Sequence, residues 1–159
     1  MLHFPLIHPE ILGALAAAGH GSTVLVADAN YAHSTGTRTG CPVVHLNLAP
    51  GLVTVEQVLL ALVGAAPFEA AALLRPDDGS PSPVRERYTR LLGADVPVSE
   101  LPRAQFRAAC RGEDLALTVA TGDTAFYANA LLTVGAVAPA AAAEPGRLDG
   151  VAAGPHQRS

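Results

Sequence analysis

The sequence predicts an α/β protein, a single domain with a central parallel or mixed sheet flanked by helices. Segments typical of strands and helices alternate along most of the chain, which is the pattern of such layered folds. The chain has 159 residues, the length of one ordinary domain, and half of them are apolar, which is enough to form a core. Residues 138–159 are mainly Ala, Pro and Gly without periodicity. We therefore expect one domain over residues 1–137 and a disordered tail over residues 138–159.

The first elements are a helix and a buried strand. Pro9 suits the first turn of a helix that continues to residue 18 and ends before Gly19. Residues 22–27 are short, β-branched and continuously apolar, as is typical of a strand covered on both faces. Ligands usually bind beyond the carboxyl ends of strands in such sheets. Asp28, at the end of this strand, is therefore the first candidate site residue.

The later elements continue the alternation. A polar loop over residues 29–42 precedes a second strand at 43–48. Thr54 suits the N-cap of a helix over residues 56–65 that Pro67 closes. The remaining segments come in the order strand, loop, helix, helix, strand and final apolar segment, at residues 70–74, 75–83, 84–92, 103–111, 115–121 and 130–137.

Composition excludes several classes of function. The net charge is −4 and the ten basic residues, all Arg, are scattered along the chain, so we expect no nucleic-acid partner. Lys is absent, which excludes a Schiff-base lysine and a phosphate-binding P-loop lysine. No glycine-rich GxGxxG loop follows the first strand, so we expect no nucleotide cofactor.

The sequence has no pattern of a membrane span or a signal peptide. The most apolar later run, residues 58–66, is far shorter than the ~20 residues that a membrane helix requires. Residues 1–19 lack a basic start and carry two His and one Glu among their apolar residues. The two cysteines, Cys41 and Cys110, are too few for a disulfide scaffold. We expect a cytoplasmic protein without a membrane partner.

The six histidines do not predict a metal site. None has the HxxxH or HxH spacing that places two imidazoles on one ion. Cys41 and His45 are close enough in sequence for a catalytic Cys-His pair, although a buried structural Cys is the commoner arrangement. We therefore expect no metal and no other cofactor.

His20 and Asp28 stand at opposite ends of the first expected strand. A strand of roughly seven residues would separate them by ~23 Å, too far for one small ligand. They share a site only if a second chain supplies one of them, or if the strand is shorter than its pattern indicates. The structural alternative is that His20 caps the preceding helix and Asp28 caps a turn.

A turn near the end of the expected domain carries a phenol and a carboxamide two residues apart. Tyr127 and Asn129 flank Ala128, directly before the last apolar segment. An amide can donate to one sugar hydroxyl and accept from its neighbour, while a phenol adds a hydrogen bond and an apolar face. The pattern favours a sugar ligand, and the alternative is that the ring packs in the core and the amide holds the turn.

Several of these segments recur together in one known family. They are Gly19-His20-Gly21, Ala27-Asp28-Ala29-Asn30, the helix from Arg103 to Phe106, Val119-Ala120-Thr121-Gly122-Asp123 and Tyr127-Ala128-Asn129. In this order they resemble the D-ribose pyranase and L-fucose mutarotase family of small sugar-handling proteins. The resemblance covers residues 5–137 and rests on the ordered set, because no single motif is decisive.

The resemblance implies a function and a set of site residues. It implies a cofactor-free isomerase that interconverts the anomers or ring forms of a free monosaccharide, with His20 as the catalytic acid/base residue. The residues that it implies contact the sugar are Asp28, Arg103, Tyr127, Ala128 and Asn129. It also implies ring-like homo-oligomers with active sites at subunit contacts, which would remove the distance objection to His20 and Asp28.

The details are more similar to the L-fucose branch than to the D-ribose branch, with departures. The loop after Asp28 has Ala32 where the family usually has Pro. Ala104 and Arg107 replace two aromatic residues of the fucose pattern, and Ala128 replaces a common Gly. The alternatives are D-ribose pyranase activity, a non-catalytic sugar-binding regulatory module, and a His-dependent isomerase that moves hydrogen between carbons. That last chemistry generally needs clustered metal ligands.

Overall fold

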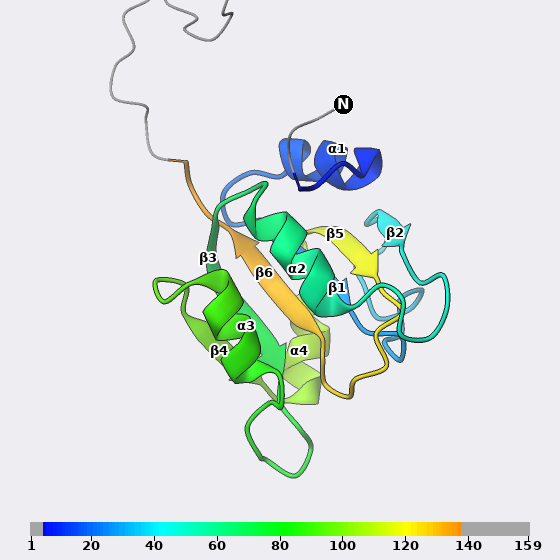
Figure 1. Ribbon diagram of the computed structural model, residues 1–159, viewed down its shortest axis with the longest axis vertical. Coiled ribbons are helices and arrows are strands. Elements are labelled where there is room, and N and C mark those ends of the chain that lie inside the picture. Colours follow the sequence, from blue (N-terminus) through cyan, green and yellow to red (C-terminus); the bar gives the residue numbers. More distant parts are fainter. Residues whose placement is uncertain (1–4, 138–159) are drawn as a thin grey trace, which may run out of the picture.

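The computed structural model describes residues 5–137, which form one mixed six-stranded sheet with helices on both faces (Figure 1). The strands are β1 (Thr23–Ala27), β2 (Val43–His45), β3 (Phe68–Leu74), β4 (Val98–Leu101), β5 (Leu115–Ala120) and β6 (Ala130–Val134). The helices are α1 (Pro9–Ala17), α2 (Val55–Val63), α3 (Arg85–Leu92) and α4 (Arg103–Cys110). The α/β prediction of one domain with a flanked mixed sheet is confirmed.

The strand order is β2-β5-β1-β6-β3-β4. β1 runs parallel to β5, with Val26 opposite Val119, and antiparallel to β6, with Leu25 opposite Leu131. β3 is also antiparallel to β6 and parallel to β4. The carboxyl ends of β1, β3, β4 and β5 therefore meet at one edge of the sheet, where β6 begins.

Two hydrophobic clusters lie on opposite faces of the sheet. The larger contains side chains of α1, α2 and α3 against alternate strand residues such as Val24 and Val26. The smaller packs Phe106 and Cys110 of α4 against Leu25 and Leu115. Figure 1 shows the same layers, with α2 and α3 in front of the sheet and α4 behind it. Because both faces are covered, the central strands are largely apolar.

Local signals explain most helix boundaries. Pro9 begins α1, as its fixed backbone angle favours. Thr54 accepts a hydrogen bond from the Gln57 amide while the Gln57 side chain accepts one from the Thr54 amide, a reciprocal capping box at the start of α2. The helix ends at Val63 with Gly64 as its cap, so the expectation that Pro67 closes it was wrong.

The structure differs from the sequence-based prediction at two strands. The short edge strand β4 was not predicted, because two of its four residues, Ser99 and Glu100, are polar. β2 has three residues instead of six, since the chain turns away after His45. The expected tail at 138–159 lies outside the described residues. No helix within residues 5–137 is long and apolar enough to cross a membrane.

Candidate functional site

A cavity of about 290 Å³ opens at the sheet edge where the parallel strands end. Its volume is at the lower end of the ~300–1,000 Å³ of small-molecule sites, which suits a ligand as small as a monosaccharide. The residues that line it are Asp28, Asn30, Tyr31, Leu74, Arg103, Phe106, Arg107, Phe126, Tyr127 and Asn129. Four of the six residues proposed from the sequence, Asp28, Arg103, Tyr127 and Asn129, are thus brought together in one cavity.

Asp28 and Asn129 form the buried floor of this cavity, and each is only 3% exposed. The Asn129 carboxamide donates to Asp28 Oδ2 at 2.6 Å and accepts from the Asp28 backbone amide at 2.9 Å. One side chain thereby fixes both the carboxylate and the backbone at the end of β1. The second carboxylate oxygen of Asp28 accepts from the Asn30 amide at 2.9 Å, which forms a local turn.

Burial raises the pKa of the Asp28 carboxyl above its usual 3.8, and the hydrogen bonds from Asn30 and Asn129 oppose that rise. The Asp123 carboxylate nearby adds a smaller upward contribution to this pKa. A carboxylate held in this way is a fixed acceptor that can bind sugar hydroxyls or take part in proton exchange.

The turn at residues 121–125 joins the strand ends behind the cavity. Thr121 Oγ1 donates to the Ala27 carbonyl at 2.8 Å, and Asp123 Oδ2 accepts from the Val55 amide at the start of α2 at 3.0 Å. A Cβ at Gly122 would overlap backbone carbonyl oxygens at Ala49 and Leu52, so only glycine fits there. The motif Thr121-Gly122-Asp123 lies outside the cavity and connects the end of β1 to the start of α2.

Tyr127 projects into the cavity from a left-handed backbone conformation. Its φ is +59°, which costs free energy for a residue other than Gly or Asn. The Ala128 side chain is fully buried and its carbonyl accepts from the Tyr88 hydroxyl at 3.1 Å. Ala128 does not line the cavity. Within this chain it contributes as the buried residue between Tyr127 and Asn129, which both line the cavity.

Helix α4 forms one wall of the cavity. Arg103, Phe106 and Arg107 all line the cavity, because residues three and four apart share one helix face. The Arg103 guanidinium lies over the Tyr127 ring, 5.8 Å from its centroid. It also donates to Asp77 Oδ1 at 3.1 Å and to Asp77 Oδ2 at 2.6 Å.

Aromatic rings complete the lining. Tyr31 packs edge-on against Phe106, with centroids 6.5 Å apart, and its hydroxyl donates to the Gly36 carbonyl at 2.8 Å. Phe126 is 76% exposed although it lines the cavity. Apolar ring faces beside hydrogen-bonding groups are the arrangement that packs against the C–H faces of a sugar while its hydroxyls are bound.

His20 lies at the opposite edge of the sheet, before β1, and not in this cavity. Its Nε2 donates to Glu69 Oε2 at 2.9 Å, and the imidazole is 62% exposed. It lines a separate, largely apolar hollow together with residues of α1 and the end of β6. The C-cap of α1 is Ala18, so the alternative that His20 caps this helix was wrong.

The strand between His20 and Asp28 is shorter than expected, but it still separates them. β1 has five residues, which span about 16 Å at ~3.3 Å per residue. The structure therefore does not bring His20 to Asp28 within one chain.

The two cysteines and His33 have structural surroundings. Cys41 is buried against Thr118, and burial raises the pKa of its thiol, which disfavours the reactive thiolate and the Cys41-His45 pair. Burial also raises the pKa of the Cys110 thiol to about 11. His33 donates from Nε2 to the Asp28 carbonyl at 2.9 Å. Within the part of the chain that the structure describes, no three His, Cys, Asp or Glu residues cluster as metal ligands do.

Several lining residues were missed from the sequence. Phe106 and Arg107 follow Arg103 by three and four positions, a spacing that would have placed them on the same helix face. Phe126 and Tyr31 lie within three residues of proposed site residues. Asp77 gave no signal, because it lies 26 positions from Arg103 in a turn-rich loop.

Comparison with known proteins locates the chain among sugar-handling proteins. The model of the RbsD/FucU transport protein family matches residues 1–137. Fucose mutarotase of Danio rerio is 32% identical over 146 residues, covering 84% of this chain and 92% of that protein. Fucose mutarotase of Mus musculus is 33% identical over 141 residues, covering 82% of this chain and 90% of its own length.

Solved structures share the fold. The Bacillus subtilis RbsD complex with D-ribose has a TM-score of 0.72 at 20% identity, covering 86% of this chain and 99% of that chain. The fucose mutarotase of Streptococcus pneumoniae in complex with L-fucose has a TM-score of 0.70 at 22% identity, covering 87% and 100%. At these identities the likeness supports the architecture.

Proposed function

The chain belongs to the RbsD/FucU family, and from this membership and the cavity we propose that it is a monosaccharide mutarotase. It is an isomerase that interconverts the anomers of a free sugar, L-fucose or a close relative, by acid/base catalysis without a cofactor. The single observation that carries the proposal is the Asp28–Asn129 pair, buried beneath Arg103 and Tyr127 in a cavity of monosaccharide size, in a chain whose curated relatives are fucose mutarotases.

The cavity offers what recognition of a neutral polyol requires. Vicinal hydroxyls need donors and acceptors in alternation, which the Asp28 carboxylate, the Asn129 amide and the Arg103 guanidinium supply. The rings of Tyr127 and Phe126 provide faces for the sugar's C–H bonds. Asp28, Arg103, Tyr127 and Asn129 are the proposed sugar-binding residues, with Ala128 contributing through its position between the last two.

Anomer exchange needs only proton transfers. A base removes the proton of the anomeric hydroxyl, an acid protonates the ring oxygen, and the bond between that oxygen and the anomeric carbon breaks to give the open aldehyde. Rotation about the adjacent C–C bond and reclosure return both protons and give the other anomer. We assign the acid/base role to His20, as the family resemblance implies, because an imidazole can both accept and deliver a proton. Such catalysis contributes ~10²–10⁴ in rate.

His20 acts in the cavity of a neighbouring chain in this account. The apolar hollow around it and the exposed Phe126 at the cavity mouth are surfaces that a second copy would cover. In the proposed ring, His20 of each chain would lie beside Asp28 of the next. The Glu69 carboxylate, 2.9 Å from His20 Nε2, would orient the imidazole toward the partner.

Saturation-transfer NMR of anomeric exchange on a panel of free sugars tests the function. We expect exchange of L-fucose to be accelerated more than that of D-ribose. Preference for ribose would assign the pyranase alternative, and sugar binding without faster exchange would assign a non-catalytic binding module. Placement in the cytoplasm remains a prediction, supported by two free buried thiols of the kind that reducing compartments maintain.

A further inference from the structure

We propose that Asp77 is a positioning residue for sugar binding, which holds the Arg103 guanidinium at the cavity wall so that its free N–H groups meet the sugar. The inference rests on the proposed function, because Arg103 is one of the residues assigned to the sugar. Asp77 itself lies outside the cavity and is not among the residues that line it.

The contact between the two side chains is bidentate. Arg103 Nε donates to Asp77 Oδ1 at 3.1 Å and Arg103 NH2 donates to Oδ2 at 2.6 Å. A guanidinium has five N–H donors in one plane, so this pair occupies two and leaves three for a ligand. The same guanidinium lies over the Tyr127 ring, 5.8 Å from its centroid, so it has a second neighbour besides the carboxylate.

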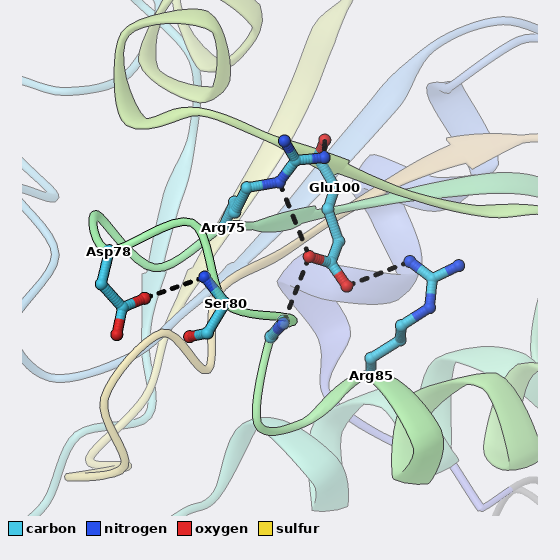
Figure 2. Close-up of polar contacts among 6 residues, drawn as sticks. Arg75, Asp78, Ser80, Arg85 and Glu100 are labelled. Carbon is cyan, nitrogen blue, oxygen red and sulfur yellow. Dashed lines mark hydrogen bonds and ion pairs between the residues drawn. The ribbon is translucent and has the colours of Figure 1, made fainter.

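The loop that carries Asp77 is braced at both ends by one buried acid. Glu100 of β4 has a side chain only 7% exposed, and its carboxylate pairs with Arg85 at 3.1 Å and with Arg75 at 3.8 Å. It also accepts from the Ser82 amide at 3.2 Å. Figure 2 shows Glu100 between Arg75 and Arg85, at the two ends of this loop.

The tip of the loop is ordered by its own turns. The Gly79 amide donates to the Pro76 carbonyl at 3.0 Å, which closes a turn over Asp77 and Asp78, and the positive φ of Gly79 then redirects the chain. The Asp78 carboxylate accepts from the Ser80 amide at 2.9 Å, a contact within the loop that Figure 2 also shows. Asp77 is therefore presented to Arg103 from a fixed segment.

Two consequences follow for the ligand. Pairing neutralises the Arg103 charge beside the cavity, and this favours hydroxyl groups over a carboxylate or phosphate at that wall. Pairing also selects one arrangement of a long, flexible side chain before the sugar arrives, which reduces the entropy lost on binding. The hydrogen bonds from Arg103 lower the pKa of Asp77, so its carboxyl is ionised at neutral pH.

The adjacent carboxylates allow a matched test. Asp77→Asn removes the charge that faces Arg103, whereas Asp78→Asn makes the same change one residue away and keeps the oxygen that accepts from Ser80. KM, kcat and the dissociation constant for L-fucose are measured for both variants. We expect Asp77→Asn to raise KM and the dissociation constant by roughly three- to fivefold, the size of effect of one exposed ion pair. We expect kcat to change less than twofold, and Asp78→Asn to match the parent.

Two further readouts separate positioning from general destabilisation. In an Arg103→Ala background, Asp77→Asn should cause no further loss of sugar affinity, because Asp77 contributes to binding only by holding the Arg103 guanidinium. The ¹⁵N signal of Arg103 Nε–H should be protected from exchange in the parent and lose that protection in Asp77→Asn without any sugar present.

The outcomes distinguish this inference from the function on which it rests. If the parent binds no monosaccharide and accelerates no exchange, the proposed function fails, while the Nε–H signal still reports whether the pair forms. If the parent is active but Asp77→Asn and Asp78→Asn behave alike, or if Asp77→Asn acts equally with and without Arg103, the positioning role is overturned.

Discussion

The carboxamide of Asn129 holds Asp28 by two hydrogen bonds at once, donating 2.6 Å to the carboxylate and accepting 2.9 Å from the backbone amide. The residues are 101 positions apart, at the start of β6 and the end of β1. Because β1 and β6 are neighbouring antiparallel strands, the two residues that form the cavity floor are attached directly to the sheet. The buried carboxylate is thereby fixed before any ligand binds.

Asn129→Ala should therefore reduce both stability and binding. The substitution leaves a buried backbone donor and a buried carboxylate oxygen without their partner, at a cost of about 2–4 kcal/mol in the free energy of unfolding. Urea unfolding measures this loss, and titration with L-fucose under native conditions measures the binding. A stability loss below about 0.5 kcal/mol, the range of surface substitutions, would show that the pair does not form in solution.

The stability of the protein should depend on the ionisation of Asp28. Burial raises the pKa of Asp28 in the folded state above 3.8, so the folded protein retains a proton that the unfolded chain releases. This contribution to stability is fully present below pH 3.8 and is lost as the pH rises through the folded-state pKa.

Asp28→Asn cannot lose a proton, so the unfolding free energy of the variant minus that of the parent should increase as the pH rises across this window. Unfolding curves of both proteins at a series of pH values measure the difference. A difference that falls with increasing pH would mean that the pKa is lowered on folding and would contradict the assignment.

Two substitutions distinguish the contribution of the Tyr127 ring from that of its backbone conformation. Tyr127→Phe keeps the ring over which Arg103 lies and removes the hydroxyl, so we expect weaker sugar binding by roughly three- to tenfold and unchanged stability. Tyr127→Gly relieves the positive φ but removes the ring, so binding should be lost while the backbone is retained. Equal affinity for sugar in the parent and both variants would make this segment purely structural.

His20→Ala should abolish anomer exchange and leave the fold intact, because the exposed imidazole contributes little packing. His45→Ala is the control, since His45 is also exposed and lies at the opposite sheet edge beside His33. Exchange rates are measured by saturation-transfer NMR and stability by urea unfolding. A His20→Ala variant within twofold of the parent rate would remove His20 from the acid/base role.

Much of the fold follows from local patterns in the sequence. Pro9 and Thr54 mark helix starts, and the uninterrupted apolar run of β1 indicates a central strand. β4 escaped prediction because Ser99 and Glu100 serve contacts that only the folded chain creates, such as the pairing of Glu100 with Arg85. Edge strands have one open side and need no continuous apolar pattern.

The candidate site was predictable in part for the same reason. Asp28 follows a strand, so the rule for the carboxyl ends of parallel strands indicates it directly. Asn129 was proposed from its turn beside Tyr127, and it reaches the same edge because the strand that it precedes, β6, runs antiparallel to β1. Asp77 was not predictable, because nothing in its own segment indicates that it will meet Arg103. His20 was identified through family resemblance alone, and the single chain leaves it at the other edge of the sheet.

Mixing His20→Ala with Asp28→Asn, each of which we expect to be inactive alone, shows whether His20 of one chain serves the cavity of another. His20→Ala retains an intact cavity and Asp28→Asn retains an intact imidazole. After the two are mixed in equal amounts and allowed to exchange subunits, about one quarter of the sites should pair the intact cavity with the intact His20. Anomer exchange should therefore recover to about one quarter of the parent rate. If mixing restores no activity although subunit exchange is demonstrated, each site lies within a single chain and the shared-site account is contradicted.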